Sequence, residues 1–400
     1  MGQSMTTVHV RTWSLAILIA ALAMLGPFSI DAYLPAFYAI GREFDVPPIA
    51  VQQTLSVYLF AYAFMMLWHG ALADALGRRP VVLASLAIYA LATLGCAIAG
   101  NIETLWLFRA LQGLFAGAGI VVGRAIIRDR FHGPEAQRLM SQITLVFGVA
   151  PAIAPVLGGV LLNTFGWRAV FWVLLVLVIA LLTWASKQLP ETLPPSARQS
   201  LLPRHLWRNY VNVLRRPEFL LLAAIPALNF AAFFLYIASA PSFLMDLLGV
   251  SSYGFAWLFI PMITGVMIGA LVSGRVAGMM TPRRTIGLGY ILMFIGVVAD
   301  LAVAMLVPPG VPWHVLPIMI YSMGSSVTMP SATLLLLDLF PTTRGLASSL
   351  QGFLQFVLAA VNAGTIAPML AGSLLTLALG MAGFTIMSLV LWITYLRHTN

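Results

Sequence analysis

The chain has 400 residues, of which 61% are hydrophobic and 8% are charged, and its mean hydropathy is +0.97. Because roughly a quarter of the residues in a soluble domain are charged, this composition excludes a soluble protein and predicts a chain embedded in a lipid bilayer. The net charge of +9 would suggest nucleic acid as the partner of a soluble protein. Here most arginines lie in short loops, where they orient membrane helices, so no nucleic acid is expected.

Twelve apolar runs follow one another along the chain, each close to the length of about 20 residues that crosses a bilayer as a helix. Only Arg11 precedes the first run and no convincing cleavage site follows it, so we interpret it as a retained helix rather than a signal peptide. The sequence predicts an all-α membrane protein with transmembrane helices at 12–34, 51–69, 80–99, 103–127, 139–163, 168–187, 219–243, 253–274, 285–307, 313–337, 345–370 and 373–396.

The basic residues are distributed asymmetrically about these spans. Only Arg42 and Arg168 fall on one side, while Arg109 and Arg124 fall within a span. Loops rich in arginine and lysine stay in the cytoplasm. The side that carries the remaining basic residues and both termini is therefore predicted to be cytoplasmic. That side carries Arg11, Arg78, Arg79, Arg128, Arg130, Arg138, Lys187, Arg198, Arg204, Arg208, Arg215, Arg216, Arg275, Arg283, Arg284, Arg344 and Arg397.

The longest polar stretch divides the spans into two groups of six. It predicts an N-terminal half at 1–187, a cytoplasmic linker at 188–217 and a C-terminal half at 218–400. The end of the linker fits either a basic amphipathic helix on the membrane surface or a solvated segment. A weak repeat indicates two pseudo-symmetric six-helix halves around a central cavity, because Gly70, Ala73 and Arg79 recur as Gly274, Ala277 and Arg283.

A polar turn with the sequence GALADALGRRP, at residues 70–80, links the second and third predicted helices. Its single carboxylate can accept hydrogen bonds from an arginine or from a helix N-terminus. Exposed ion pairs contribute under about 1 kcal/mol, which suits a cytoplasmic gate that must open repeatedly. The alternative is a basic loop that only sets orientation. The gate residues are Gly70, Asp74, Gly77, Arg78 and Arg79.

Buried charge is expected near the outer ends of the first and fourth helices. At a rise of 1.5 Å per residue, Asp31 and Arg109 lie within about 10 Å of the same face. A buried carboxylate is costly unless it is paired, so we expect Asp31 to pair with Arg109 and to take up a proton when the pair separates. The alternatives are a solvated or turn-capping Asp31 and a structural Arg109 bonded to helix carbonyls. Arg124 lies nearer the cytoplasm, where snorkelling to the headgroups explains it as well as function does.

The fifth predicted helix combines prolines with glycines. Each proline removes a helix hydrogen bond and bends the helix, and the glycines allow close backbone contact. A bent helix with a small-residue face suits a pivot between the halves, and tight packing alone is the alternative. The residues are Gly148, Pro151, Pro155, Gly158 and Gly159.

Several polar and aromatic residues fall on helices expected to line the cavity. Aromatic rings and a few amides suit amphipathic compounds, because large apolar contacts tolerate many shapes, although each residue could equally be a packing residue. Asp300, in the ninth helix, is an intramembrane acid that could also reach water in the outer leaflet. The cavity residues are Tyr33, Tyr58, Asn229, Tyr236 and Gln355.

Together these motifs resemble the major facilitator superfamily. The loop 70–80 matches its loop signature, LFRALQG at 107–113 resembles its fourth-helix arginine motif, and GVAPAIAPVLGG at 148–159 is similar to the fifth-helix motif of drug–proton antiporters. The segments DAYLP at 31–35, RAIIRD at 124–129 and GLASSLQG at 345–352 resemble the Bcr/CflA branch. The resemblance implies a bacterial inner-membrane exporter of lipophilic drugs, driven by proton entry, that confers antibiotic resistance.

The expected partners are therefore small-molecule drugs, protons and the lipid bilayer, with the protein as a monomer. We expect no cofactor beyond the proton gradient as the energy source, since the chain has no phosphate-binding Walker loop, and no metal, since its histidines are scattered. The chief alternative is a proton-coupled uptake symporter for a small solute on the same fold. A membrane-embedded enzyme or sensor is a more distant alternative, because no soluble catalytic or signalling domain is evident.

Overall fold

A computed structural model describes residues 3–131, 133–198, 203–341 and 343–399, and the side chains of 3–13, 133–138, 140–149, 203–206, 209 and 399 lie outside this description. The first half and the linker contain α1 (Gln3–Asp31), α2 (Phe37–Phe44), α3 (Pro48–Met66), α4 (His69–Leu76), α5 (Arg78–Ala97), α6 (Ile102–Ala116), α7 (Ala118–Arg130), α8 (Gly133–Phe165), α9 (Arg168–Gln188) and α10 (Pro203–Leu214). The second half contains α11 (Pro217–Ala238), α12 (Ala256–Val276), α13 (Pro282–Leu306), α14 (Leu316–Asp338), α15 (Arg344–Val361), α16 (Ala367–Leu370) and α17 (Leu374–Thr399).

Local sequence signals set several helix boundaries. Asn101 precedes α6, and its side chain accepts a hydrogen bond from the Thr104 backbone N–H at 2.8 Å, as is favoured at a helix N-cap. Gly77 separates α4 from α5 with a φ of 105°, a backbone conformation that glycine adopts readily. Pro48 and Pro217 begin α3 and α11, where a missing N–H leaves no helix hydrogen bond unmade.

Eleven segments within the described ranges are helical, long enough and apolar enough to cross a bilayer. The twelfth crossing is α8, whose described apolar part is Ala150–Phe165. The prediction of an all-α protein with twelve transmembrane helices is therefore confirmed.

The helices depart from the predicted runs where proline or glycine interrupts them. The first span continues through a 3₁₀ turn around Pro35 into α2, and the fourth span is divided at Gly117 into α6 and α7. Pro241 precedes a π-helix, η3 (Ser242–Leu247), that the sequence analysis had not anticipated. Proline lacks a backbone N–H and cannot continue the helical hydrogen-bond ladder, which accounts for the breaks at Pro35 and Pro241.

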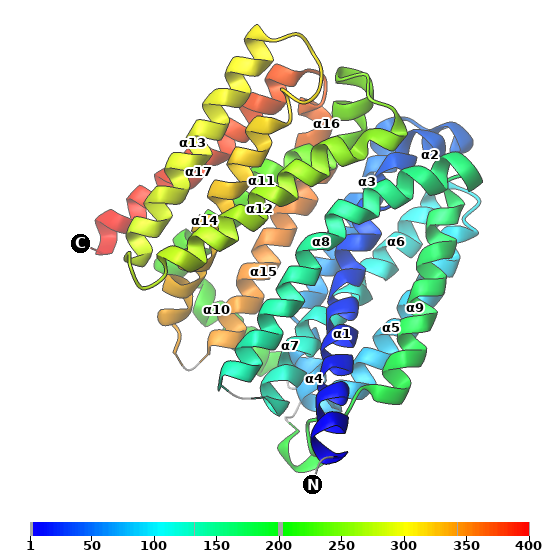
Figure 1. The fold of residues 1–400 in the computed structure, drawn as a ribbon, viewed down its shortest axis with the longest axis vertical. Coiled ribbons are helices and arrows are strands. Elements are labelled where there is room, and N and C mark those ends of the chain that lie inside the picture. The colour runs from blue at the N-terminus through cyan, green and yellow to red at the C-terminus, as the bar shows by residue number, and fades with distance from the viewer. Residues whose placement is uncertain (1–2, 132, 199–202, 342, 400) are drawn as a thin grey trace.

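The two groups of six spans form the two halves of the molecule, seen side by side in Figure 1, from blue to green and from yellow-green to red. Within the first half α1 packs on α8 and α3 on α6, and within the second half α11 packs on α17 and α13 on α14. The main helix contacts between the halves are those of α3 with α15 and of α8 with α12. The buried apolar residues of both halves belong to one continuous cluster, and these helix pairs join the halves.

The two ends of the bundle differ in charge. Helix ends on one side carry Arg78, Arg128, Lys187, Arg344 and Arg397, and we call this side the basic face. The other end, reached by α2, η3 and the start of α6, is called the opposite face.

Candidate functional site

Arg109 on α6 is completely buried, with 0% of its surface exposed. Its Nη1 donates to the Ser29 carbonyl at 3.3 Å and to Gln112 Oε1 at 2.8 Å. The guanidinium carbon lies 4.6 Å from the centroid of the Tyr33 ring and 4.3 Å from that of the Tyr58 ring, within cation–π range. Among the described residues Nε and Nη2 find no hydrogen-bond partner, so the cation retains donors for another group.

Asp31 ends α1 and is 4% exposed. Arg109 contacts residues on either side of it, Ser29 and Tyr33, but the four ion pairs in the described ranges do not include Asp31 with Arg109. The expected pair is therefore not formed in this conformation, because two aromatic rings and Gln112 hold the guanidinium instead. An ionised carboxylate buried without a cation is costly, which favours the protonated, neutral form of Asp31.

A polar network surrounds this arginine inside the first half. The Tyr58 hydroxyl is 2.9 Å from Ser29 Oγ and donates to the Gly26 carbonyl at 3.2 Å. Gln112 Nε2 donates to Thr93 Oγ1 at 2.8 Å. Tyr58 is fully buried, as is Tyr33, so the two rings expected in a cavity instead form the walls of the arginine site.

The expected cavity residues of the second half are also buried. Asn229 and Tyr236 are 1% exposed and Gln355 is 8% exposed. Tyr236 donates a hydrogen bond to Asp300 Oδ2 at 2.5 Å. Asp300 is itself only 3% exposed, so the alternative that it reaches water in the outer leaflet is wrong for this conformation.

Arg124 stands apart from the buried site. It lies on α7 and is exposed, and it is near enough to Tyr62 to act on that ring electrostatically. No hydrogen bond or ion pair connects it to Asp31 or Arg109 within the described ranges. The structure thus brings Asp31 and Arg109 into one neighbourhood and leaves Arg124 outside it.

Two adjacent glycines of α8 contact the two different halves of the molecule. A Cβ on Gly158 would lie 1.8 Å from the Ala32 carbonyl oxygen, directly after Asp31. A Cβ on Gly159 would lie 2.4 Å from the Ser252 carbonyl oxygen in the second half. Gly148, Pro151 and Pro155 lie inside the same helix, and the surroundings of Gly148 fall outside the description. Only glycine permits both close approaches, which places α8 against both halves.

The predicted loop at 70–80 is helical up to Leu76 and again from Arg78, and only Gly77 lies outside α4 and α5. This connection forms a cluster of charges at the basic face. Arg78 donates through Nη1 to Asp74 and through Nε to Asp129 Oδ2 at 3.2 Å. The side chain of Arg78 is 10% exposed, so this cation is largely shielded from water. The gate residues therefore tie the loop to the end of α7.

The linker adds a second set of bonds to the same loop. Glu191 accepts from the backbone N–H of Arg78 at 3.1 Å and of Arg79 at 3.2 Å, at the N-terminus of α5, where a carboxylate is favourable. A Cβ on Gly77 would lie 2.5 Å from Glu191 Oε2, the mobile end of a side chain, so the glycine is explained by its φ of 105°. Gly70 has more room, with its nearest neighbour Val121 Cγ1 4.0 Å away.

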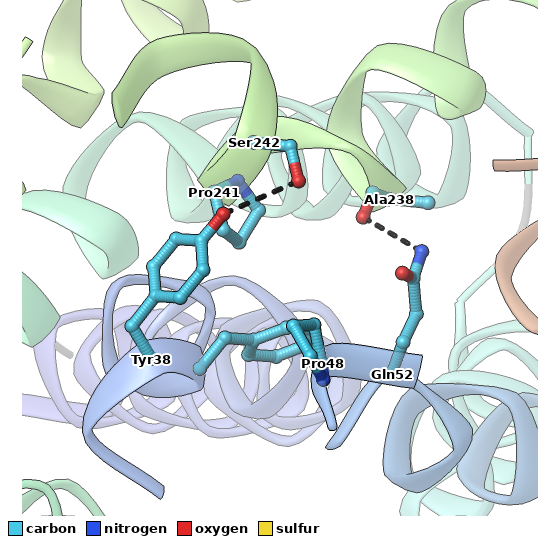
Figure 2. Close-up of a pocket in the computed structure, with 7 residues that line it drawn as sticks. Tyr38, Pro48, Gln52, Ala238, Pro241 and Ser242 are labelled. Carbon is cyan, nitrogen blue, oxygen red and sulfur yellow. Dashed lines mark hydrogen bonds between the residues drawn. The ribbon is translucent and has the colours of Figure 1, made fainter. Parts of the chain in front are cut away.

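Contacts between the halves gather toward the opposite face. Tyr38 on α2 donates to Asp246 and lies 3.4 Å from Ser242 Oγ, both on η3. Gln52 Nε2 donates to the Ala238 carbonyl at 3.1 Å. Figure 2 shows Tyr38, Ser242 and Gln52 at a small pocket, which is lined by Phe37, Tyr38, Pro48, Gln52, Ala238, Pro241 and Ser242.

Further hydrogen bonds join the halves below this pocket. Gln53 Nε2 donates to the Gly364 carbonyl at 2.8 Å, and Ser56 Oγ donates to the Ala360 carbonyl at 2.9 Å. Asn163 on α8 bonds Ser252 at 2.8 Å. The structure is therefore closed at the opposite face.

The sequence analysis missed most of these closing residues. Tyr38, Gln52 and Asp246 belong to no motif used above, and the break at Pro241 was the only signal in the sequence for η3. Gln112 and Asp129 were quoted within motifs without a role, although each holds a buried or shielded arginine. Glu191 was part of the linker and carried no local pattern.

A sequence model described as the Major Facilitator Superfamily matches residues 17–363. The chain belongs to this superfamily. It is accordingly a transporter and not an enzyme, which confirms the resemblance inferred from the motifs of the loop and of the fourth and fifth helices.

Relatives extend over almost the whole chain. An uncharacterised MFS-type transporter of Bacillus subtilis, YdgK, is 31% identical and covers 93% of this chain and 94% of its own. A bicyclomycin resistance protein homologue of Haemophilus influenzae is 27% identical over 90% of each chain. Multidrug resistance protein D of Escherichia coli is 28% identical over 86% of each chain.

Solved structures agree with the fold. The nucleoside transporter NupG superposes with a TM-score of 0.75 at 12% identity, covering 97% of this chain and 99% of its own. At that identity the likeness concerns the fold alone.

Proposed function

We propose that the protein exports small lipophilic drugs across the bacterial inner membrane in exchange for protons. The observation that carries the proposal is the buried neighbourhood of Asp31 and Arg109. Within the described ranges a buried carboxyl without an ion-pair partner lies near an arginine whose Nε and Nη2 donate no hydrogen bond. The names of the relatives, a bicyclomycin resistance homologue and a multidrug resistance protein, support drugs as the transported class.

In this proposal Asp31 binds the proton and Arg109 controls when it is released. The structure has Asp31 buried and its ionised form disfavoured. When α1 and α6 move, the free donors of Arg109 can approach the Asp31 carboxylate and stabilise its charged form. Proton release would then occur together with the movement that turns the transport site from one side of the membrane to the other, because both require the Asp31 carboxylate and the Arg109 guanidinium to meet.

The remaining motifs supply the movement. The halves, 1–187 and 218–400, would rock about α8, whose Gly158 and Gly159 touch one half each. The loop with Asp74, Arg78 and Arg79 would form the gate at the basic face, with the linker 188–217 bound to it through Glu191. The basic face and both termini would be cytoplasmic, by the positive-inside rule, and a monomer would suffice because each chain contains both halves.

Drug susceptibility of a bacterial host that lacks its own exporters tests this function. Expression of the protein should raise the minimum inhibitory concentrations of several lipophilic compounds, and Asp31→Asn should abolish the increase. Glu103→Gln is a matched control, because this carboxylate is exposed at the start of α6. Unchanged susceptibility together with accumulation of a solute would favour uptake and contradict export.

A further inference from the structure

We infer that Asp300 is a second proton-binding residue, and that its bound proton stabilises the closed opposite face through Tyr236 and η3. The inference rests on the rocking of the two halves proposed above, which exposes the transport site to one side of the membrane at a time. It assigns to the second half a proton-binding site distinct from Asp31 and Arg109.

Asp300 is buried without a compensating charge. It lies on α13, six residues from the end of that helix at Leu306, or about 9 Å along the axis. Tyr236 donates to its Oδ2, and no ion pair within the described ranges includes it. One hydrogen bond does not offset the desolvation of a carboxylate in a membrane protein, so this conformation favours the neutral acid.

The elements packed against Asp300 provide hydroxyl groups rather than cations. Tyr321 on α14 and Thr385 on α17 are fully buried and bonded to each other at 3.3 Å, and Tyr290 bonds Ser388 at 2.7 Å. His314, before α14, faces the Gly310 carbonyl through Nδ1 at 3.0 Å. Apart from Asp300 itself, the Asp, Glu, Lys and Arg residues of α11, α13, α14 and α17 lie toward the basic face, at Glu218, Arg283, Arg284, Asp338 and Arg397.

A continuous series of contacts leads from Asp300 to the closed opposite face. The Tyr236 ring packs edge-on against Phe243, with centroids 5.0 Å apart. Phe243 belongs to η3, whose Ser242 and Asp246 contact Tyr38 of the first half. Insertions of π-helix into membrane helices often mark functional positions. A shift of η3 away from α2 therefore displaces Phe243 from Tyr236 and opens a route for water to Asp300.

The direction of the coupling follows from this geometry. When the opposite face opens, water solvates Asp300 and its proton passes to that water, leaving a carboxylate bonded to the Tyr236 hydroxyl. When the face closes, the carboxylate must take a proton back from water before burial. Acid favours the conformation that binds a proton more tightly, which here is the closed one with a neutral Asp300. Acidification of the solution at the opposite face therefore closes that face. This is the closure that proton-driven export requires after the drug has left.

The experiment measures closure without any drug. Spin labels on cysteines introduced at Arg42 and Ser251, both exposed at the opposite face, report the distance between the halves by double electron–electron resonance, in a Cys96→Ala background in lipid nanodiscs. Acidification should increase the short-distance population of this parent protein. Asp300→Asn should abolish the pH dependence and hold the short distance throughout, whereas Asp338→Asn, an exposed carboxylate on the basic face, should titrate as the parent does.

A second variant keeps the test decisive if Asp300→Asn does not fold. Tyr236→Phe removes the hydroxyl that stabilises the ionised carboxylate, so the midpoint of closure should move to higher pH. A parent-like titration in either variant would overturn the inference.

Asp31→Asn separates the two proposals. Retained pH-dependent closure in that variant supports an independent site at Asp300. Loss of pH-dependent closure assigns the titration to Asp31 and contradicts the inference. If the protein moves no drug but closes through Asp300, the proposed export falls and this inference stands.

Discussion

The guanidinium of Arg109 lies over the ring of Tyr58, with its central carbon 4.3 Å from the ring centroid. The hydroxyl of that tyrosine is fixed in turn at Ser29 and at the Gly26 carbonyl on α1. The arginine is therefore positioned by the rings of Tyr33, just after α1, and Tyr58 on α3 rather than by the Asp31 carboxylate. This arrangement leaves Asp31 free to change its protonation state without first breaking an ion pair.

Arg109→Lys should reduce drug transport about five- to thirtyfold. A lysine keeps the charge but lacks the planar guanidinium that stacks on two rings while bonding Gln112, and lost cation–π contacts of about 1–2 kcal/mol correspond to that factor. Initial rates of drug movement in vesicles provide the measurement. Arg168→Lys is the matched control, since Arg168 also lies over a ring, Trp167 at 4.2 Å, but outside the buried site; an equal loss in both variants would contradict a special role for Arg109.

Gly158→Ala should lower the thermal unfolding temperature and impair transport. The added methyl group would stand 1.8 Å from the Ala32 carbonyl oxygen, so α8 must move away from α1 at a cost of about 1–3 kcal/mol. Gly383→Ala on α17 meets nothing within 4 Å and should unfold at nearly the wild-type temperature. Identical melting curves for the two variants would show that α8 tolerates separation from α1.

Asp74→Asn should slow transport about two- to tenfold without abolishing it. The substitution removes one of the two carboxylates bonded to Arg78, and Asp129 remains, so a loss of about 0.5–1.5 kcal/mol is expected. Asp338→Asn breaks an exposed pair with Arg344 on the same face and should leave the rate unchanged. A wild-type rate for Asp74→Asn would argue that the loop only sets orientation.

Acid should destabilise the protein through His69 at the start of α4. Burial lowers the pKa of His69 to about 4, compared with about 6.5 in an unfolded chain. Between these two pKa values His69 is protonated in the unfolded chain but neutral in the folded protein. Its contribution to stability is therefore complete above about pH 6.5 and declines as the pH falls toward about 4. Its full loss is on the order of 1–3 kcal/mol.

Melting temperatures measured across this pH range test the effect of His69. His69→Gln should flatten the acid limb of the curve, whereas His398→Gln at the exposed end of α17 should leave it unchanged. An acid limb that is identical in wild type and His69→Gln would mean that other groups control it.

The sequence was sufficient for the fold because hydropathy and charge asymmetry act locally along the chain. The apolar runs located the spans, and GALADALGRRP located the connection between two of them, where Asp74 and Arg78 do bond each other, although all of it but Gly77 is helical. The sequence did not predict how each helix is rotated about its axis or which side chains of different helices meet. No pattern along α1 or α6 indicates that Arg109 faces Tyr33 and Tyr58 rather than Asp31, and none places Asp300 against Tyr236, because both depend on how helices distant in sequence turn toward one another. The same limitation hid Tyr38 and Asp246, whose contact joins elements 208 residues apart in the sequence.

Proton and drug fluxes in vesicles that contain only this protein test the central claim most directly. With an imposed proton gradient, wild type should move a lipophilic drug against its concentration difference while protons move the opposite way, and Asp31→Asn should lose both coupled fluxes. Collapsing the pH gradient and the membrane potential should stop the uphill movement. Drug extrusion that continues unaltered after that collapse would contradict proton-coupled export by this chain.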